Sequence, residues 1–452
     1  MKINEGIFKS YDIRAIVGED LNPDVAEIIG KSFGTKVREL GEKKVIVGHD
    51  NRKSSDSLND GLIKGLLSTG VDVIDIGLVT SPILYYARKM FGIGPAVMIT
   101  ASHNTGEYNG FKLCLYESEE NIYGEGIQDL KRFTLKGDFI EGEGTLSKAE
   151  IVQNYIDMIC DKVKLGKRKL KVVVDCGNGT ASVVALSLLE KLGCEVIPIY
   201  CDSDPDFPNH HPDPSIPENL KDAAKLVKQI GADIGIGFDG DGDRIGVIDE
   251  NGVVLLGDMF MIMMLRDVAK TIPIKKGIVE VKCSKALADE IEKLGGEPVY
   301  FRTGNPYIKA EIRKENIPFS GEMSGHMYFL DEYYGYDDAT YAAARVLRTL
   351  SNTEKNVSEL LEGVNKYYST PEVQIPIEEE KKKDAVEMIT KYFAERGHEI
   401  ITVDGARVLF ENGWGLVRAS NTSPILSARY ESSSYEGLEY IQNQFQTALK
   451  QI

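Results

Sequence analysis

Cysteine motifs are absent from this chain of 452 residues. Its six cysteines are scattered, and no two form a Cys-x-x-Cys pair: Cys114, Cys160, Cys176, Cys194, Cys201 and Cys283. This spacing argues against a zinc ribbon and against a dithiol redox centre. A chain of this length also needs no disulfide framework in order to fold.

Long apolar runs are absent as well. The N-terminal stretch MKINEGIFKSYDIR contains no apolar segment of the kind that a secretory signal needs. The most apolar stretch, Met259 to Leu265, is far too short to cross a bilayer and indicates a buried helix. We therefore expect a cytoplasmic protein that does not enter a membrane.

Positive charge is scarce: 53 Lys and Arg residues face 70 Asp and Glu residues, which gives a net charge of −17. A nucleic-acid-binding protein would show a basic face, and so would a protein that binds an anionic membrane, so neither partner is expected. Small anionic substrates remain compatible, because a few cations can dominate the potential of a cleft. The hydrophobic content of 42% and the charged content of 27% are those of an ordinary globular protein.

Length and pattern indicate four domains. A hydrophobic core stops growing at about 250–300 residues, so this chain must hold several. Three stretches share one plan, in which basic residues precede an apolar strand, a small-polar turn and a helix; they begin at Lys43, Lys169 and Lys275. The C-terminal part instead predicts antiparallel strands with two helices. The predicted domains are residues 1–148, 149–252 and 253–368, each α/β, and a smaller α+β domain, 369–452.

Local signals mark the ends of some elements. Asn22-Pro23 combines a capping residue with a proline at the first helical position, and apolar residues follow at helical spacing. This pattern predicts a helix from Pro23 onward. Near the C-terminus, Asp404-Gly405 and Asn412-Gly413 are hairpin-turn signals that separate three short strands.

The first candidate site follows a predicted strand over Pro95–Thr100, which leads to Ser102 in a loop of small polar residues and glycine. Such a loop exposes a hydroxyl at the carboxyl end of a sheet, where α/β proteins place ligands. A serine hydrolase fits poorly, because the Gly-x-Ser-x-Gly elbow is missing and His103 is too close in sequence to act easily as the base for Ser102. A turn in which Ser102 hydrogen-bonds its own backbone is the structural alternative.

The second candidate site is the loop Asp239-Gly240-Asp241-Gly242-Asp243-Arg244, between two apolar strands. Carboxylates at alternate positions suit a hard divalent cation, and the glycines let the loop wrap so that the carboxylates converge. We favour a catalytic Mg²⁺ site over a solvated acidic loop. A calcium EF-hand is the competing interpretation, because Glu250 stands twelfth from Asp239; against it, Arg244 takes the sixth position, where the turn needs glycine.

Two further loops carry groups that suit a phosphosugar. In the segment Gly321–His326 the polar side chains alternate, so an extended segment would point them all one way, toward sugar hydroxyls. In the segment Arg418–Pro424 a guanidinium stands beside short hydrogen-bond donors, which suits a phosphate. Each loop alone would equally fit a polar surface turn. The candidate binding residues are Glu322, Ser324, His326, Arg418, Ser420, Asn421 and Thr422.

Together the four loops resemble those of the alpha-D-phosphohexomutase superfamily, in the same order and over essentially the whole chain. The resemblance implies three similar α/β domains with mixed sheets plus a smaller C-terminal α+β domain around a central cleft. It implies a phosphoryl group on Ser102 and one Mg²⁺ per chain, bound by that phosphate and by Asp239, Asp241 and Asp243. A hexose 1,6-bisphosphate would serve as intermediate and as activator.

The resemblance extends to the substrate. The loop around Met323 is similar to that of the phosphomannomutase/phosphoglucomutase group, whereas phosphoglucosamine mutases usually have Gln there. This implies an isomerase that interconverts the 1- and 6-phosphates of mannose or glucose, as a monomer or homodimer. The alternatives are a phosphoglucosamine mutase, a catalytically weak sugar-phosphate-binding paralogue, and a metal-dependent phosphatase or kinase, although a Walker A loop and a kinase glycine-rich loop are both missing.

Other positions match the family's active site: Tyr11 and Arg14 in Tyr-Asp-Ile-Arg, Lys112 in Asn-Gly-Phe-Lys, and Lys282 in Val-Lys-Cys. Lys112 would carry a proton or clamp a phosphate, and Arg244 would offset charge on the transferring group. Arg14 and His103 complete the expected catalytic set.

One departure from the family concerns Asn305, in Thr-Gly-Asn, where the group tends to carry a His considered for acid/base work. Asn cannot shuttle a proton near neutral pH. Either Lys112, Arg14 or His326 then covers the role, or turnover is reduced, or the substrate preference differs.

Overall fold

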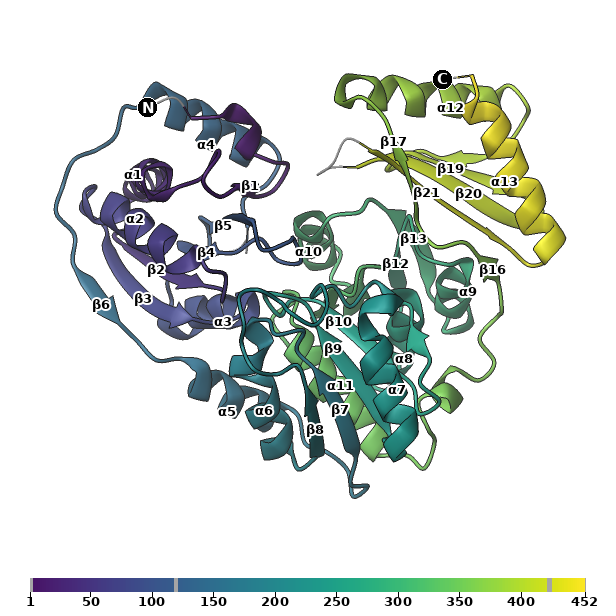
Figure 1. Cartoon of the computed structure of the whole chain (residues 1–452). Helices are drawn as coiled ribbons and strands as arrows, with labels where there is room; N and C mark the ends of the chain where they lie inside the picture. The colour runs from purple at the N-terminus through teal and green to yellow at the C-terminus, as the bar shows by residue number, and fades with distance from the viewer. Residues whose placement is uncertain (1–2, 118–120, 421–424, 452) are drawn as a thin grey trace. The chain divides into compact units, whose positions relative to one another are not determined.

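The computed structural model describes residues 3–117, 121–420 and 425–451. The chain divides into two compact units. Unit 1 consists of Met1–Leu256, Ser324–Tyr328 and Tyr336–Leu360, and unit 2 of Gly257–Met323, Phe329–Gly335 and Leu361–Ile452. Figure 1 labels helices and strands of both units where there is room.

The first sheet of unit 1 has the strand order β1-β5-β4-β2-β3-β6. Its strands are β1 (Ile13–Ile16), β2 (Lys44–His49), β3 (Asp72–Leu78), β4 (Ala96–Ile99), β5 (Tyr108–Cys114) and β6 (Leu146–Lys148). The helices of this part are α1 (Pro23–Glu39), α2 (Ser55–Leu67), α3 (Ser81–Phe91) and α4 (Glu125–Lys136). β2 is parallel to β3 and β4, whereas β5 is antiparallel to β1 and β4, so the sheet is mixed. Because β2 and β4 are parallel neighbours, the loops that follow them leave the same edge of the sheet.

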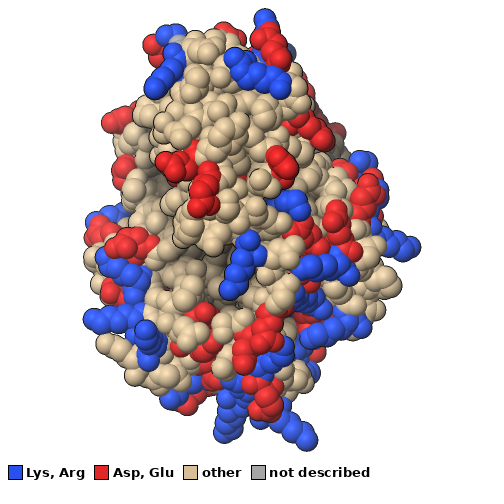
Figure 2. Space-filling model, turned by 90° about the vertical axis from the view of Figure 1, so that its right-hand side faces the viewer, with Lys and Arg blue, Asp and Glu red and all other residues tan. Residues whose placement is uncertain are grey.

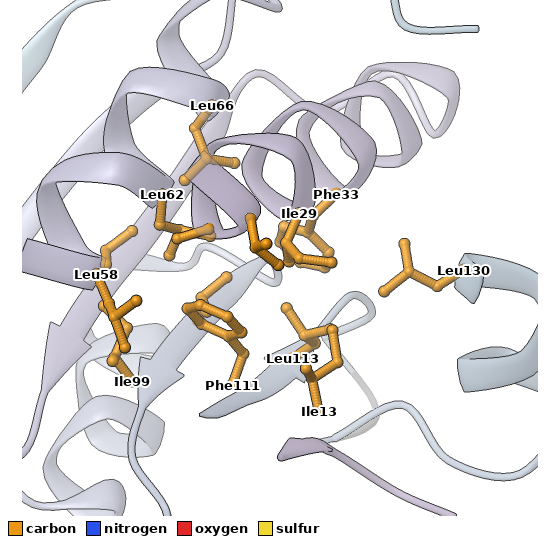
Figure 3. Close-up of a cluster of buried hydrophobic side chains, with 14 of the residues drawn as sticks. Ile13, Ile29, Phe33, Leu58, Leu62, Leu66, Ile99, Phe111, Leu113 and Leu130 are labelled. Atoms are coloured by element: carbon orange, nitrogen blue, oxygen red, sulfur yellow. The ribbon is translucent and has the colours of Figure 1, made fainter. Parts of the chain in front are cut away.

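Helix α1 begins where the sequence predicts it. Asn22 Oδ1 accepts a hydrogen bond from the backbone N–H of Val25, and Pro23 occupies the first turn. The helix packs closely on α2, since a Cβ on Gly65 would lie only 2.1 Å from the carbonyl oxygen of Glu27. Figure 3 shows the apolar cluster beneath the two helices, which includes Ile13, Ile29, Phe33, Leu58, Leu62, Leu66, Ile99, Phe111, Leu113 and Leu130. Burial of each such side chain contributes about 1.5–3 kcal/mol, so this cluster is a main source of stability.

The second sheet of unit 1 has the order β11-β10-β9-β7-β8. Its strands are β7 (Lys171–Asp175), β8 (Glu195–Ile199), β9 (Ile234–Phe238), β10 (Ile245–Ile248) and β11 (Val254–Leu255), and its helices are α5 (Val152–Lys162), α6 (Ala185–Leu192), α7 (Lys221–Ile230) and α11 (Ala339–Ser351). β7 is parallel to β8 and β9, and β10 is antiparallel to β9. Helix α11 comes from far along the chain and contacts β10 and α6. Its capping residue Asp338 accepts a hydrogen bond of 2.7 Å from the hydroxyl of Tyr155 on α5.

Unit 2 begins with an α/β part. Its strands β12 (Lys276–Glu280) and β13 (Glu297–Phe301) are parallel, and its helices are α8 (Gly257–Val268), α9 (Lys285–Lys293) and α10 (Asn305–Lys314). Two short strands follow, β14 (Phe319–Gly321) and β15 (Met327–Phe329). Helix α8 contains the apolar run of the sequence, and its residues 260–265 are all buried, as expected.

The C-terminal part of unit 2 is an antiparallel sheet in the order β16-β21-β20-β19-β18, with β17 also paired to β21. Its elements are β16 (Tyr368–Ser369), β17 (Val373–Pro376), α12 (Lys382–Ala394), β18 (Ile400–Ile401), β19 (Ala406–Phe410), β20 (Gly413–Ala419), β21 (Ile425–Ser432) and α13 (Tyr435–Leu449). The buried guanidinium of Arg407 lies 3.6 Å from the ring centroid of Trp414 and donates to the carbonyl oxygen of Val281 at 2.5 Å. This contact joins the C-terminal sheet to the segment after β12.

Five short 3₁₀ helices complete the secondary structure that the described residues show: η1 (Glu5–Ile7), η2 (Thr180–Val183), η3 (Pro217–Leu220), η4 (Ser358–Leu361) and η5 (Glu379–Lys381).

The predicted fold class is confirmed, with three α/β parts on mixed sheets and a smaller α+β part. The shared plan of the three stretches corresponds to strand and helix pairs: β2 with α2, β7 with α6, and β12 with α9. The boundaries after residues 148, 252 and 368 stay a prediction, and α11, inside the predicted third domain, belongs to unit 1. The turn expected at Asn412-Gly413 falls one residue earlier, because Gly413 already pairs with Phe410 at the start of β20.

Among the residues that the structure describes, no helix combines the length and the apolar character needed to cross a bilayer. Figure 2 shows one face on which Lys and Arg side chains are interspersed with Asp and Glu. On that face the basic side chains do not form one continuous area.

Candidate active site

Ser102 lies in the loop between β4 and β5 in a conformation that is unusual for serine. Its φ of 51° is in the left-handed region, which costs a residue with a Cβ about 1–2 kcal/mol. Its backbone N–H donates to Thr100 Oγ1 at 2.9 Å, and its own hydroxyl donates to Asp239 Oδ2 at 3.0 Å. The side chain of Ser102 therefore does not serve as the turn-forming group, and it points at the second candidate site.

The three loop aspartates converge between β9 and β10, and all are fully buried. Asp239 Oδ1 accepts hydrogen bonds from the backbone N–H groups of Asp243 at 3.0 Å and of Arg244 at 3.1 Å. These bonds fold the loop back on its first carboxylate. The carboxylates of Asp239, Asp241 and Asp243 consequently share one site.

Two glycines allow this loop to approach Ser102. Gly242 has a φ of 74°, which a residue with a side chain rarely adopts. A Cβ on Gly240 would lie 2.5 Å from the carbonyl oxygen of Ser102. Any larger residue at position 240 would push the aspartate loop and the serine loop apart.

Lys112 on β5 supplies the opposing charge. Its Nζ donates to Asp241 Oδ2 at 2.5 Å, to Asp243 Oδ2 at 2.6 Å and to Ser81 Oγ at 3.2 Å. Burial lowers the pKa of Lys112, but the attraction of the two carboxylates outweighs it and holds this pKa well above its usual value. Burial, with repulsion from Asp243 and Asp241, raises the pKa of Asp239 well above its usual range. One ammonium group therefore does not balance three carboxylates.

The remaining oxygens of the cluster fit a divalent cation. The Oδ1 atoms of Asp241 and Asp243 are buried without a hydrogen-bond partner among the described residues. One ligand atom from each of the three aspartates lies within 4.8 Å of the others. Carboxylate oxygens buried in this way need a compensating charge, and an all-oxygen set is the one that Mg²⁺ prefers. The residues thus fit the predicted Mg²⁺.

Arg244 extends from this loop to a histidine. Its Nε donates to His326 Nε2 at 3.1 Å, so a neutral His326 carries its proton on Nδ1. That Nδ1 atom lies 2.9 Å from Asp337 Oδ2 and 3.5 Å from Asp243 Oδ1. The guanidinium of Arg244 is thereby fixed beside the aspartate cluster.

The prediction of an extended conformation around Met323 is wrong. Met323 and Ser324 form a turn, and Gly325 has a φ of 95°, so the chain reverses instead of alternating. The alternation expected for Glu322, Ser324 and His326 in an extended segment therefore does not apply. Ser324 and His326 belong to unit 1, whereas Glu322 belongs to unit 2.

Arg14 on β1 lies against the serine loop. Its Nη1 donates to Asn104 Oδ1 at 2.6 Å, and its Nη2 donates to Asp12 Oδ2 at 2.7 Å. Tyr11, which precedes this pair in the chain, is half-buried. The structure brings Arg14 to the active-site loop as the sequence led us to expect, through the antiparallel pairing of β1 with β5.

His103 is poorly placed to act as a base for its neighbour. Its Nδ1 is 3.5 Å from Ser102 Oγ, which is at the outer limit of a hydrogen bond. Burial, followed by repulsion from Arg244 and Arg14, lowers the pKa of His103 well below its usual value. A neutral His103 is therefore expected at neutral pH.

Two cations at predicted positions lie in unit 2. Lys282 Nζ lies 3.3 Å from Glu372 Oε2. Arg418, at the end of β20, donates through Nε to Asp404 Oδ2 at 3.0 Å. Its Nη2 is buried without a hydrogen-bond partner among the described residues. Such a group is suited to an anionic ligand.

The other predicted residues of unit 2 lie in polar surroundings. Glu322 Oε2 accepts a hydrogen bond of 3.2 Å from the backbone N–H of Gly304. Asn305, the next residue, begins α10 and is half-buried. The backbone N–H of Ser420 donates to the carbonyl oxygen of Ile425 at 3.0 Å. Asn421 and Thr422 lie outside the described residues.

The EF-hand alternative does not fit the structure. The carboxylate of Glu250 accepts hydrogen bonds from the hydroxyl of Ser358 at 2.5 Å and from its backbone N–H at 3.2 Å. Both flanks of the aspartate loop are strands. Glu250 therefore holds Ser358 at the start of η4 and is not a ligand of the loop.

Sequence reasoning missed several residues of the site. Ser81, at the start of α3, donates its hydroxyl to Asp241 Oδ2 at 2.5 Å. Asp337 lies against His326 from a segment with no recognisable motif. His210 lies 3.0 Å from Asp175 Oδ1, in the segment whose Pro212 is near Gly240. The Ser-Pro helix start at Ser81 and the unusual His-His-Pro-Asp-Pro run were the available signals.

The pair of His210 with Asp175 should make stability depend on pH. Burial lowers the pKa of His210, but hydrogen bonding and attraction to Asp175, helped by a hydrogen bond to the backbone carbonyl of His211 and by Asp222, raise it overall. A raised folded-state pKa stabilises fully below the unfolded value of about 6.5 and loses its effect as pH rises through the folded value. The thermal unfolding midpoint of His210→Gln should therefore fall further below wild type at about pH 6 than at about pH 8.5. An equal difference at both pH values would contradict this role for His210.

The geometry around Ser102 defines a class of protein. Phosphoryl transfer needs positioning and charge stabilisation more than covalent chemistry. Here a buried hydroxyl faces a carboxylate set that fits Mg²⁺, with lysine and arginine on either side. The fold and the site are those of an enzyme that moves a phosphoryl group.

Comparison with known proteins narrows this class. The domain families described as phosphoglucomutase/phosphomannomutase, alpha/beta/alpha domains I, II and III match residues 5–124, 153–252 and 256–367, and the C-terminal domain matches 372–448. The chain belongs to the phosphoglucomutase/phosphomannomutase family. It is thus a phosphohexomutase, an isomerase, and the predicted superfamily is confirmed.

Individual relatives are similar to this chain over nearly their full lengths. A phosphomannomutase/phosphoglucomutase of Pseudomonas putida is 42% identical over 448 residues, which cover 99% of this chain and 96% of that protein. A phosphoglucomutase of Neisseria gonorrhoeae is 40% identical over 452 residues, with coverage of 99% and 97%. The crystal structure of a phosphoglucomutase/phosphomannomutase family protein from Burkholderia thailandensis has a TM-score of 0.92 at 40% identity, with coverage of 99% and 98%. Interconversion of hexose phosphates is therefore favoured over the phosphoglucosamine alternative.

Proposed function

We propose that the enzyme interconverts the 1- and 6-phosphates of mannose and glucose through a phosphoserine at Ser102 and a hexose 1,6-bisphosphate. One observation carries this proposal: Ser102 Oγ lies 3.0 Å from Asp239 Oδ2, at the edge of a fully buried carboxylate cluster. A phosphoryl group on that oxygen would sit where charge can be held and stabilised.

The cycle starts from the phosphorylated enzyme. A hydroxyl oxygen of the hexose phosphate attacks the phosphorus, the bond from phosphorus to Ser102 Oγ breaks, and the hydroxyl proton is removed. The product is the 1,6-bisphosphate. In the second step Ser102 Oγ attacks the other phosphorus, the bond to the sugar oxygen breaks, and that oxygen regains a proton. Because the cycle ends with phosphoserine, added bisphosphate also activates enzyme that has lost its phosphate.

The residues of unit 1 divide the work. Asp239 orients Ser102 Oγ, and Lys112 and Arg244 place positive charge beside the transferring group. When bound, one Mg²⁺ per chain would be held by Asp239, Asp241 and Asp243 and would stabilise negative charge on the phosphoryl oxygens. Arg14 adjoins the serine loop, and His103 is part of it. Since Asn305 cannot move a proton, Lys112, Arg14 and His326 are the candidates for that step.

Substrate recognition is assigned to the remaining polar residues. Lys282 and Arg418 would hold the phosphate that is not being transferred, because both are cations near the ends of strands. Glu322 and Ser324 would bind the 3- and 4-hydroxyls, which glucose and mannose share, so the site would accept both sugars. The other assigned binding residues are Tyr11, Asn305, His326, Ser420, Asn421 and Thr422.

The cellular setting follows from composition. With a net charge of −17, the enzyme should bind neither nucleic acid nor membrane, and phosphosugars are its expected partners. We assign it to the cytoplasm, as a monomer or homodimer.

An assay with defined sugars tests the proposal. With Mg²⁺ and a trace of hexose 1,6-bisphosphate, both glucose 1-phosphate and mannose 1-phosphate should be converted, and glucosamine 1-phosphate should react more slowly. The intact mass of the purified enzyme should include one phosphoryl group, mapped to Ser102 by peptide mass spectrometry. Faster conversion of glucosamine 1-phosphate would favour the phosphoglucosamine mutase instead. No turnover of any of the three sugars would favour the sugar-phosphate-binding paralogue.

A further inference from the structure

Arg52 lies outside every motif that points to the active site. It is in the loop between β2 and α2, and β2 pairs in parallel with β4, so this loop meets the Ser102 loop at one edge of the sheet. The side chain of Arg52 is only 1% exposed. A buried guanidinium is tolerated only when its N–H groups are bonded.

All five N–H donors of this guanidinium have acceptors. Nε donates to Asp50 Oδ2 at 3.0 Å. The two Nη groups donate to four backbone carbonyl oxygens of one loop, those of Ser102 (2.7 Å), Asn104 (2.6 Å), Thr105 (2.7 Å) and Tyr108 (3.0 Å). The planar guanidinium group of Arg52 thus fixes the backbone from Ser102 to the start of β5.

The guanidinium group of Arg52 is itself held in place by Asp50. Asp50 Oδ1 accepts from the backbone N–H of Arg52 at 3.1 Å and from Ser55 Oγ at 2.5 Å. Ser55 Oγ is in turn bonded to Asn109 Nδ2 at 3.0 Å. Asp50 is therefore fixed on both sides, and it prevents the guanidinium from rotating.

The hydrogen bond from Arg52 to the carbonyl oxygen of Ser102 affects the direction in which the Ser102 hydroxyl points. With a φ of 51°, Ser102 is in a strained conformation that persists only where surrounding contacts hold it. Arg52 holds that carbonyl at 2.7 Å, and Gly240 approaches it from the aspartate loop. A relaxed Ser102 would turn its Oγ away from Asp239, and a misplacement of about 1 Å can cost on the order of 10²-fold in rate.

We propose that Arg52 is a positioning residue for phosphoryl transfer. It holds the backbone of the serine loop so that Ser102 Oγ, free or phosphorylated, stays aimed at Asp239. This inference rests on the proposed function of Ser102 as the phosphoryl carrier. Lysine cannot replace Arg52, because an ammonium group has three donors and no planar fork.

Arg52→Lys tests the role, and Arg88→Lys is the matched control. Arg88 is equally buried and donates to the carbonyl oxygens of Gly94 at 2.6 Å and Tyr116 at 2.5 Å, away from the serine loop. For Arg52→Lys we expect kcat to fall about 100-fold with KM within about threefold of wild type. Arg88→Lys should lower the thermal unfolding midpoint and keep kcat within about twofold.

Two further readouts separate positioning from stability. In a single turnover, transfer from glucose 1,6-bisphosphate to Ser102, followed by intact mass, should slow in Arg52→Lys as much as kcat does. In Arg52→Ala, added guanidinium ion should restore part of kcat by filling the space of the lost side chain. The same ion should not restore Ser102→Ala.

The outcomes that overturn the inference are distinct. Near-normal kcat in Arg52→Lys would contradict it, and so would an equal loss of kcat in Arg88→Lys or a loss confined to KM. Unfolded Arg52→Lys and Arg52→Ala beside a folded Arg88→Lys would make Arg52 a folding residue and would also contradict it. Wild-type enzyme without phosphate on Ser102 under any condition would instead remove the proposed function itself.

Discussion

Ser102→Ala should lose turnover by on the order of 10⁴-fold or more, while its affinity for glucose 1-phosphate stays within a few-fold of wild type. The variant removes the only atom that can accept and return the phosphoryl group in the proposed cycle. The hydroxyl of Ser81 donates to Asp241 and accepts from Lys112, and we do not expect it to take over the transfer. A coupled assay measures turnover, and titration calorimetry measures binding.

Ser57→Ala is the control for this experiment. Ser57 is an exposed serine of the same unit whose hydroxyl contacts only a backbone carbonyl among the described residues. Its replacement should leave turnover unchanged. Activity of Ser102→Ala within tenfold of wild type would rule out covalent transfer through this residue.

Removal of the metal should have the second large effect. Chelation should abolish activity, and Mg²⁺ should restore it. Asp241→Asn keeps the shape of the side chain but removes one of the three charges and one of the oxygens buried without a partner among the described residues. We expect kcat to fall by on the order of 10³-fold.

Thermal unfolding gives a readout of the same site without turnover. Mg²⁺ should bind the folded wild-type protein and raise its unfolding midpoint, and the rise should be much smaller in Asp241→Asn. Asp56→Asn is the control, because the side chain of Asp56 is 91% exposed. Equal shifts in wild type and Asp241→Asn would place the metal elsewhere.

Contiguous motifs made much of the site predictable. The serine loop and the aspartate loop each connect two adjacent strands. Residues that are close in sequence within such a loop are therefore also close in space. The helix start at Asn22-Pro23 was predictable for the same reason, since a cap and a proline act within one turn. Local chemistry of this kind does not depend on how distant segments pack.

The rest depended on topology. Asp337 acquires its role because its segment reaches His326, and Arg52 because β2 happens to adjoin β4. No local sequence pattern at either residue predicts its role. The alternating pattern from Glu322 to His326 gave a wrong prediction because it assumes an extended backbone, whereas the backbone turns at Gly325.

The passage of the chain between its two units has a consequence for biosynthesis. Unit 1 is not contiguous: Ser324–Tyr328 and Tyr336–Leu360 are added to it after a long stretch that belongs to unit 2. A nascent chain that has emerged only as far as Leu256 therefore lacks the histidine that holds Arg244 and the helix that packs on β10. At about 5–20 residues per second, the ribosome needs roughly 5–20 s more to reach Leu360. For that interval the aspartate loop belongs to an incomplete unit, and unit 1 can be completed only when most of the chain has been made.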